Sequence, residues 1–490
     1  MPTGAALRNF RKLQKPARFL RVAAFGGLSL GLSGCIPGLE KPELSLEVPA
    51  SYRAAAKGDA DAAVPALAWW RGFRSPELTG LMESAQLYNL DIAVAIAQIV
   101  QADAQAGVSG AALLPSISGS ANAERQRVAT GSSSSLGGGT TFSQFSLGLS
   151  ASYIVDFWGK NRATLSASEE SATVSRYNRE VVALTTMATV ANTYFQVLAA
   201  QDQIKATRRN LAAAERILAL IKSQFAGGTA SQLDLSQQEA LVATQRAAIP
   251  PLEVTLGQNT AALAVLVARA PADFNVRGGS TTQIAVPRIT PGMPSELLYQ
   301  RPDVRQAEAQ LASSNFSVDA ARAAFFPQIQ LTGTTGFQSA ALVSLFAPGA
   351  WYYTLAAGLT QPLFDGFLLE SQFKLAKGQQ LQYLQAYRKA VLSAFADVEK
   401  ALIALQKYTL QERLQSEVVA ASRKAFEVAE TQLRGGTVNL ITVLQTQQTL
   451  FTAENNLVTV RLNKLLAASS LFQALGGGWT PAGTLAAAAQ

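Results

Sequence analysis

The chain has 490 residues, of which 48% are hydrophobic and only 15% are charged. It contains no histidine and a single cysteine, Cys35, which excludes Ser-His-Asp and Cys-His nucleophiles, disulfides within the chain, and metal sites with His or Cys ligands from one chain. The net charge of +8 depends on six basic residues before position 35, because removing these six from 41 leaves 35 bases against 33 acids. We therefore expect no enzyme, no catalytic residue, no metal site and no nucleic-acid partner.

The low charge content also bears on how the chain buries its surface. Ordinary soluble domains carry about 25% charged residues, so this chain is expected to bury apolar surface in a large assembly, in a β-barrel, or in both. No uninterrupted run of about 18 apolar residues follows position 35, so no helix is expected to span a membrane.

The N-terminus has the pattern of a secretory signal. Residues 1–21 are basic, Val22 to Leu32 are mostly apolar, and Leu32-Ser33-Gly34-Cys35 follows. This last motif resembles the lipobox of bacterial lipoproteins, which implies a signal peptide over 1–34 and a covalent lipid on Cys35 as the only attached group. Ile36 stands where an aspartate would favour the inner membrane, so the resemblance implies the outer membrane. An ordinary signal with an incidental cysteine is the alternative.

A first helix is expected after residue 75, followed by strands at 113–129 and 140–157. Apolar and small polar residues alternate along the second segment, which is typical of a strand with one face in lipid. The same alternation recurs later at 325–339 and 350–364. Four strands cannot close a barrel, and open edges in lipid leave backbone groups unpaired, so three copies with twelve strands are predicted. A soluble β-sandwich is the alternative.

Very long helices are expected at 159–226 and 367–434. No proline or glycine lies between Gly159 and Gly227, and only Gly378 interrupts the second segment. At about 1.5 Å per residue each helix would measure roughly 100 Å, and its apolar residues have coiled-coil spacing. Return helices are expected at 231–269, with a bend at Pro250-Pro251, and at 438–475. Solvent-exposed coiled coils are the alternative.

The chain is internally duplicated. At an offset of 212 (91 to 303), four residues recur, and at an offset of 208 (227 to 435) the turn between the long helices recurs. The first set is Asp91, Ala95, Ala97 and Gln98 against Asp303, Ala307, Ala309 and Gln310, and the second is Gly227-Gly228-Thr229 against Gly435-Gly436-Thr437. The first repeat is placed at 75–269 and the second at 295–475, with its own helix before its strands.

Several motifs resemble those of TolC/OprM-type outer-membrane factors, especially the lipoprotein NodT branch. They are Arg301-Pro302-Asp303-Val304-Arg305-Gln306-Ala307-Glu308, residues 320–327 ending in Phe326-Pro327, Trp69-Trp70-Arg71, Asp156-Phe157-Trp158-Gly159 and Leu475-Gly476-Gly477-Gly478-Trp479. The resemblance implies a mainly α protein with a transmembrane β part: a homotrimeric twelve-stranded barrel continued by a coiled-coil helical barrel. Residues 35–74, 270–294 and 476–490 would form the periplasmic belt and tail.

The resemblance also implies a function and partners. The protein would be the passive exit duct of a tripartite efflux pump, in contact with outer-membrane lipid, a periplasmic adaptor and an inner-membrane pump. Two alternatives stay open, namely the outer component of type I protein secretion and a structural coiled-coil envelope lipoprotein. Arg301, Pro302, Asp303 and Pro327 are interpreted as structural, with Pro302 at the first position of a helix.

Candidate functional residues lie near the two glycine turns. The turn residues are expected to meet the adaptor, or else serve only as helix stops. Polar residues of the return helices are the candidates for a lumen constriction: Asp234, Gln237 and Gln238 in one half, and Thr442, Gln445 and Gln448 in the other. Relatives often carry charged residues where Gln445 and Gln448 stand, so a constriction with neutral contacts is predicted and Asp234 is its nearest acid. Alternatively, Gln445 only packs on a neighbouring helix.

Overall fold

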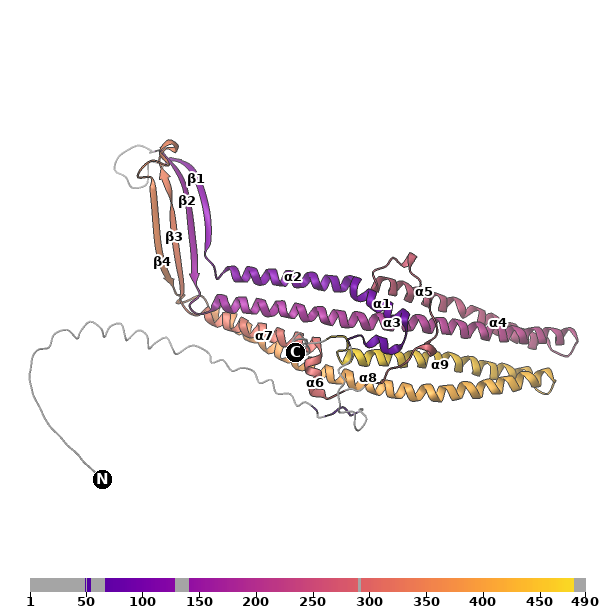
Figure 1. The fold of residues 1–490 in the computed structure, drawn as a ribbon. Coiled ribbons are helices and arrows are strands. Elements are labelled where there is room, and N and C mark those ends of the chain that lie inside the picture. The colour runs from indigo at the N-terminus through magenta and orange to yellow at the C-terminus, as the bar shows by residue number, and fades with distance from the viewer. Residues whose placement is uncertain (1–48, 50, 54–66, 128–140, 290–291, 480–490) are drawn as a thin grey trace, which may run out of the picture. The chain divides into compact units, whose positions relative to one another are not determined.

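The computed structural model describes residues 49, 51–53, 67–127, 141–289 and 292–479. The expected signal peptide, Cys35 and most of the segment up to residue 66 lie outside the described residues, as do 128–140 and 480–490. The first half contains η1 (Trp69–Phe73), α1 (Pro76–Tyr88), α2 (Leu90–Ala111), β1 (Ser116–Arg127), β2 (Thr141–Val155), α3 (Lys160–Ala226), α4 (Gln232–Ala247) and α5 (Ile249–Leu266) (Figure 1). After η2 (Pro271–Asp273) and η3 (Thr281–Gln283), the second half contains α6 (Pro294–Gln300), α7 (Pro302–Ala323), β3 (Gln328–Ser339), η4 (Leu342–Ser344), β4 (Trp351–Thr360), α8 (Leu368–Arg434) and α9 (Leu440–Ala474).

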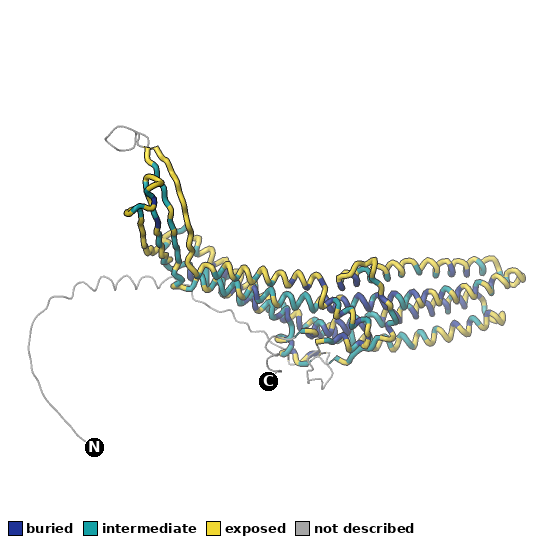
Figure 2. The backbone as a smooth tube through the Cα atoms, turned by 45° about the horizontal axis from the view of Figure 1, so that its top comes forward, coloured by how far each residue is buried: buried dark blue, intermediate teal, exposed yellow. Residues whose placement is uncertain are grey.

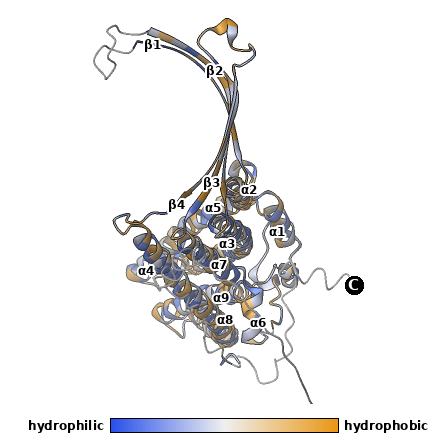
Figure 3. Ribbon diagram, turned by 90° about the vertical axis from the view of Figure 1, so that its left-hand side faces the viewer, coloured by the Kyte–Doolittle hydropathy of each residue, from blue (hydrophilic) through white to orange (hydrophobic). Residues whose placement is uncertain are grey.

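The four strands form one antiparallel sheet in the order β1-β2-β3-β4. The register pairs Leu147 with Ala121 and Phe337, and Phe337 with Trp351, so apolar residues of all four strands share one face. The other face is polar, with the hydroxyl oxygens of Ser118 and Ser150 2.7 Å apart. Within the described residues β1 and β4 each pair on one side only. The predicted four-stranded sheet with an apolar and a polar face is confirmed, and its curvature is visible in Figure 3.

The two long helices, α3 and α8, have 67 residues each. Each ends at a glycine pair whose second member has a positive φ, 76° at Gly228 and 70° at Gly436. The amide of Thr229 donates to the carbonyl of Gln224 and that of Thr437 to the carbonyl of Gln432, both at 2.9 Å. This pattern closes a helix with a left-handed glycine. It explains why the chain reverses direction at both glycine pairs.

Two helices that the sequence predicted as single are divided in two, and the return helix 231–269 is interrupted close to its predicted bend. The helix before the strands breaks at Asn89 in the first half and at Arg301 in the second, where both residues have extended backbones. Asn89 is an N-cap, and Arg301 precedes Pro302, a position that disfavours helical ψ. The return helix 231–269 breaks at Ala248, just before Pro250-Pro251, whereas the proline-free α9 is continuous over 35 residues.

At two of these breaks the N-cap side chain bonds to the end of another helix. The side-chain amide of Asn89 donates to the carbonyl of Leu266 at the end of α5, at 2.8 Å. In the second half Arg301 Nη1 donates to the carbonyl of Ala474 at the end of α9, at 3.3 Å. Each N-cap residue therefore satisfies an otherwise unpaired C-terminal carbonyl of the incoming helix, and α5 is joined to α2 as α9 is joined to α7.

The hairpins share buried cores. Ile217 and Ile221 of α3 pack with Leu433 and Leu440 of the second hairpin, which places the two turns together. A larger cluster around Phe73, Leu78 and Phe195 lies where η1 and α1 cover the helices, and Figure 2 shows burial concentrated in this middle part. The segments Pro76–Ala111 and Lys160–Ala226 are long and apolar enough to span a membrane by composition. The expectation that no helix spans a membrane stays a prediction, and the second window is mostly buried, as in a core helix.

An ion pair marks the same place in each hairpin. Glu215 of α3 lies 2.8 Å from Arg246 of α4, and Arg423 of α8 lies 2.5 Å from Glu454 of α9. Both partners shift by 208 positions between the halves, from 215 to 423 and from 246 to 454. The charges are exchanged but the link is kept, which is the packing expected of a duplicated hairpin.

Candidate functional site

The segment η1 covers one side of α9. Trp69 and Phe73 of η1 pack against Phe472 of α9, with the Trp69 and Phe472 rings stacked at 4.9 Å. Leu465 and Ala468 of α9 lie in the same cluster. This side of α9 is therefore covered, and its opposite side is left uncovered by this segment.

A groove of about 830 Å³ lies near the turns between α4, α8 and α9. Three of the predicted constriction residues, Gln237, Gln445 and Gln448, line it together. The other lining residues are Leu241, Gln415, Val418, Ile441, Leu444, Thr449, Thr452, Ala453 and Asn456. None of these side chains is ionised, so the groove offers amide and hydroxyl hydrogen-bonding groups beside aliphatic surface.

The other candidates of the return helices serve their own helices. The carboxylate of Asp234 accepts from the amide of Ser231 at 2.9 Å and from its hydroxyl at 2.7 Å, which completes a capping box at the start of α4. Gln238 is fully buried and donates to the carbonyl of Ala214 at 2.8 Å. Thr442 donates its hydroxyl to the N-cap Asn439 at 2.8 Å. The structure therefore brings neither Asp234 nor Gln238 to the groove.

The turn residues Gly227-Gly228-Thr229 and Gly435-Gly436-Thr437 are exposed. A Cβ built on Gly228 or Gly436 meets no atom within 4 Å. The positive φ of these glycines, rather than space, therefore opposes a side chain there. The turns leave a free surface at which a partner can bind.

Arg301 connects three helices at the α9–α7 joint. Its Nε and Nη2 donate to the two oxygens of Asp303 at 2.9 and 2.7 Å, and its Nη atoms lie 3.3 and 3.4 Å from Asp397 of α8. Burial lowers the pKa of Arg301, but the two carboxylates outweigh burial and raise it above its usual range. Asp397 is 96 residues away in the chain, and no sequence pattern indicated this contact.

The motif around Pro327 holds the junction of sheet and helices. The carbonyl of Pro327 accepts from the indole of Trp158 at 2.8 Å, and the Trp158 ring stacks on Phe326 at 4.5 Å. Asp156 accepts from the amides of Asn161 and Arg162, both at 2.9 Å, which caps the start of α3. The Asp156-Phe157-Trp158-Gly159 and Phe326-Pro327 motifs thus meet, although they lie in different halves.

Within the described ranges no group of three or more His, Cys, Asp or Glu side chains is placed to hold a metal ion. The charged clusters on these residues are ion pairs instead. One of them centres on Glu412 of α8, which accepts from Arg461 Nε at 3.1 Å and Lys464 Nζ at 2.9 Å of α9.

Replacing Glu412 with glutamine should lower the stability of the α8–α9 hairpin at neutral pH by about 1–2 kcal/mol, because two cations lose their partner. Burial raises the pKa of Glu412, but the hydrogen bonds from Lys464 and Arg461 outweigh burial and lower it. A lowered folded-state pKa stabilises above the unfolded value of about 4.3, and this contribution is lost as pH falls through the folded-state pKa. Thermal melting of the wild type and of the Glu412→Gln variant, at pH 7 and in acid, should show a difference in stability that shrinks on acidification. An equal difference at both pH values would contradict this.

Comparisons with known proteins agree with this architecture. The profile described as "Outer membrane efflux protein" matches residues 81–269 and 293–477. The pyoverdine export outer membrane protein OpmQ of Pseudomonas putida is 37% identical over 456 residues, covering 92% of this chain and 96% of that protein. The toluene efflux pump outer membrane protein TtgC of P. putida is 31% identical over 467 residues, covering 94% and 95%.

Solved structures show the same fold. The open-state MtrE outer membrane channel of Neisseria gonorrhoeae superimposes with a TM-score of 0.79 at 28% identity, covering 91% of this chain and 98% of that one. The outer-membrane channel OprN gives a TM-score of 0.84 at 23% identity, covering 91% and 100%. These matches confirm the predicted fold class and the resemblance inferred from the motifs.

Proposed function

The chain belongs to the outer membrane efflux protein family, and from this membership we propose that it is the exit duct of a tripartite pump that works with a periplasmic adaptor and an inner-membrane transporter. The protein is an outer-membrane channel subunit. Three copies join the free edges of β1 and β4 to close a barrel of twelve strands. The observation that carries the proposal is the sheet with one apolar and one polar face, continued by two 67-residue helices.

The cargo is a small molecule rather than a protein. Relatives at 37% identity are named for pyoverdine export, and one at 31% for toluene efflux. Deleting the gene in its host should lower the amount of a secreted siderophore in the medium or raise sensitivity to solvents. Unchanged export and sensitivity, together with loss of a secreted protein from the medium, would indicate type I secretion instead.

The protein is anchored by lipid at Cys35, in addition to its barrel. Support comes from the lipobox-like motif Leu32-Ser33-Gly34-Cys35, and two or more acyl chains give a stable anchor. Labelling with radioactive palmitate should mark the wild type and not a Cys35→Ser variant. Equal labelling of both proteins would refute the anchor.

The narrow part of the duct is held by neutral contacts at Gln445 and Gln448. Both side chains lie in the uncharged groove near the turns, and threefold symmetry repeats them around the axis. Gln445→Ala should raise single-trimer conductance in planar bilayers, because it removes side-chain volume and a hydrogen-bonding amide. Asp234→Ala removes only a helix cap, at a cost of about 1 kcal/mol, and should leave conductance unchanged. If Gln445→Ala does not raise conductance, the constriction lies elsewhere.

The turns at Gly228 and Gly436 are the docking points for the adaptor. Their exposed position at the end of both hairpins supports this assignment. Large side chains at these two glycines should weaken co-purification of the adaptor while trimers still form. Intact co-purification would limit these glycines to ending the helices.

A further inference from the structure

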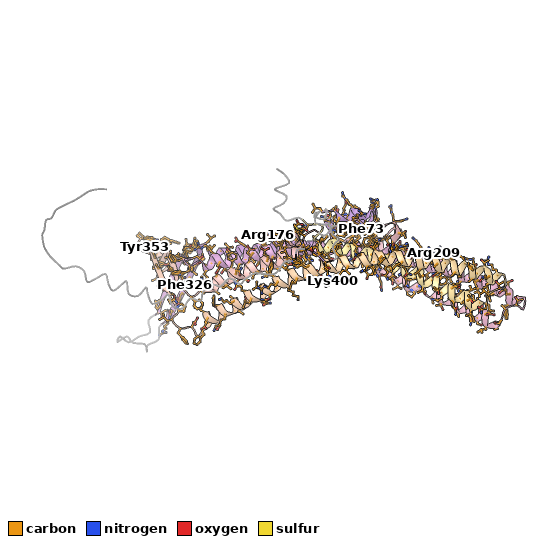
Figure 4. All side chains as sticks on the ribbon, turned by 90° about the horizontal axis from the view of Figure 1, so that it is seen from below. Phe73, Arg176, Arg209, Phe326, Tyr353 and Lys400 are labelled. Atoms are coloured by element: carbon orange, nitrogen blue, oxygen red, sulfur yellow. The ribbon has the colours of Figure 1, made fainter. Side chains whose placement is uncertain are left out.

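A second cavity, of about 670 Å³, lies where α9 ends and α7 begins. Its charged members are Arg301, Asp303, Asp397 and Lys400. Lys400 is labelled in Figure 4, in the middle of the helical part and away from the sheet marked by Tyr353. Unlike the groove near the turns, this cavity is therefore lined by ionised side chains, and we call it the ionised cavity.

Both cavities lie on the same face of the wall. On α9, the residues that line the groove and the cavity follow each other at intervals of seven and four, which keeps them on one side of a helix. They are Gln445, Thr452, Asn456, Asn463 and Ser470. On α8 the same spacing links Asp397, Ala404, Tyr408 and Gln415. Leu465 and Phe472, which pack in the cluster around η1, are on the opposite side of α9, so both cavities open on the uncovered face. In the duct proposed above this uncovered face is the inner face, because the interior of a duct is open.

The inner face of α9 carries no charge of its own. The ionised residues of this helix are Glu454, Arg461 and Lys464, which pair with Arg423 or Glu412 of α8 and do not line either cavity. Solute that moves along α9 from the turns therefore meets amides and hydroxyls first, and ionised groups only at the α9–α7 joint.

The four charges of the cavity differ in how firmly they are held. Arg301 and Asp303 are 2.7 Å apart, whereas Asp397 lies 3.3 Å from Arg301 and its side chain is 41% exposed. Lys400 is exposed and makes no ion pair with any described residue. The formal charges cancel, two positive against two negative. Neutralising either Asp397 or Lys400 by substitution therefore leaves the cavity with a net charge of known sign.

We propose that this cavity, repeated once per chain around the axis, sets the ion preference of the open duct, with Asp397 attracting cations and Lys400 attracting anions. Rings of charged side chains are a general means of ion selection in pores. Charges in a narrow tube act within a Debye length of about 8 Å at physiological salt. The balanced cluster gives the wild type a weak preference, which suits a duct for cargo of varied charge. The inference rests on the channel function proposed above.

The test measures the reversal potential of purified trimers in planar bilayers under a potassium chloride gradient. Asp397→Asn should shift the permeability ratio toward chloride and Lys400→Gln toward potassium, each by about threefold, because a potential of about one kT changes the local ion concentration by roughly that factor. The double variant should return to the wild-type value. Glu417→Gln and Lys424→Gln are matched controls, since both residues are exposed on α8 and line neither cavity.

If the Asp397→Asn and Lys400→Gln trimers conduct ions with the reversal potential of the wild type, this inference is overturned. The proposed channel function would not be affected by that result. Equal shifts from the two control variants would overturn the inference as well, because the effect would then be a general surface charge. A wild-type trimer that conducts no ions would overturn the duct itself. Lys400→Gln breaks no ion pair of the described residues, so this arm of the test does not depend on the Arg301 joint staying folded.

Discussion

Replacing Arg301 with leucine is expected to destabilise the trimer by about 1.5–3 kcal/mol, because a half-buried network of hydrogen bonds between a guanidinium and two carboxylates is lost. The side chain of Arg301 is only 11% exposed and contacts Asp303, Asp397 and the carbonyl of Ala474. Removing it therefore affects three helices and the joint between α9 and α7. The melting temperature of the detergent-solubilised trimer should fall by several degrees or the trimer should fail to assemble.

The matched control is Arg71→Leu. Arg71 pairs with Glu83 at 3.0 Å, but the two side chains are 67% and 49% exposed, and such surface pairs contribute about 1 kcal/mol or less. Arg301→Lys should restore only part of the stability that Arg301→Leu loses, since an ammonium group cannot make the two parallel hydrogen bonds to Asp303 that a guanidinium makes. If Arg301→Leu melts like Arg71→Leu, the Arg-Pro-Asp motif does not act through the joint.

Local patterns accounted for most of the secondary structure. The alternation of apolar and polar residues predicted the strands, the stretches without glycine or proline predicted the long helices, and the glycine pairs predicted the turns. Each of these patterns depends only on residues that are neighbours in the chain. The capping box Ser231–Asp234 was equally local, yet Asp234 was assigned to the constriction. A helix N-terminus competes for a carboxylate three residues on, and this signal was present in the sequence.

Contacts between distant segments could not be predicted in this way. Asn89 bonds to Leu266 across 177 residues and Arg301 contacts Asp397 across 96, and neither pair has a spacing that marks it. The buried face of a return helix could not be predicted from the sequence either. Gln237 lines the groove while its neighbour Gln238 packs on α3, because about 100° of rotation separates adjacent residues on a helix.

The strands β2 and β3 approach each other closely at a pair of glycines. Gly148 and Gly336 face each other in β2 and β3, and Gly336 also faces Tyr352 of β4. A Cβ on Gly336 would collide with the carbonyl oxygen of Leu147 and would lie 2.6 Å from the Cα of Gly148. Both are backbone atoms of the neighbouring strand, so no side-chain rotation can relieve the contact.

Gly336→Ala should therefore force β2 and β3 apart and destabilise the barrel by about 3 kcal/mol or more, at the upper end of overpacking effects. The same substitution at Gly358 is the control, because a Cβ there meets no atom within 4 Å and Gly358 lies on the same polar face, in β4. The measurements are the yield of trimer in the outer membrane and its melting temperature on heating in detergent. We expect Gly358→Ala to match the wild type and Gly336→Ala to lose most of its trimer, since each copy contributes the same faulty strand pair to a barrel with no spare edge. Equal stability of the two variants would mean that the strands at Gly336 can separate freely, which would contradict the close approach of β2 and β3.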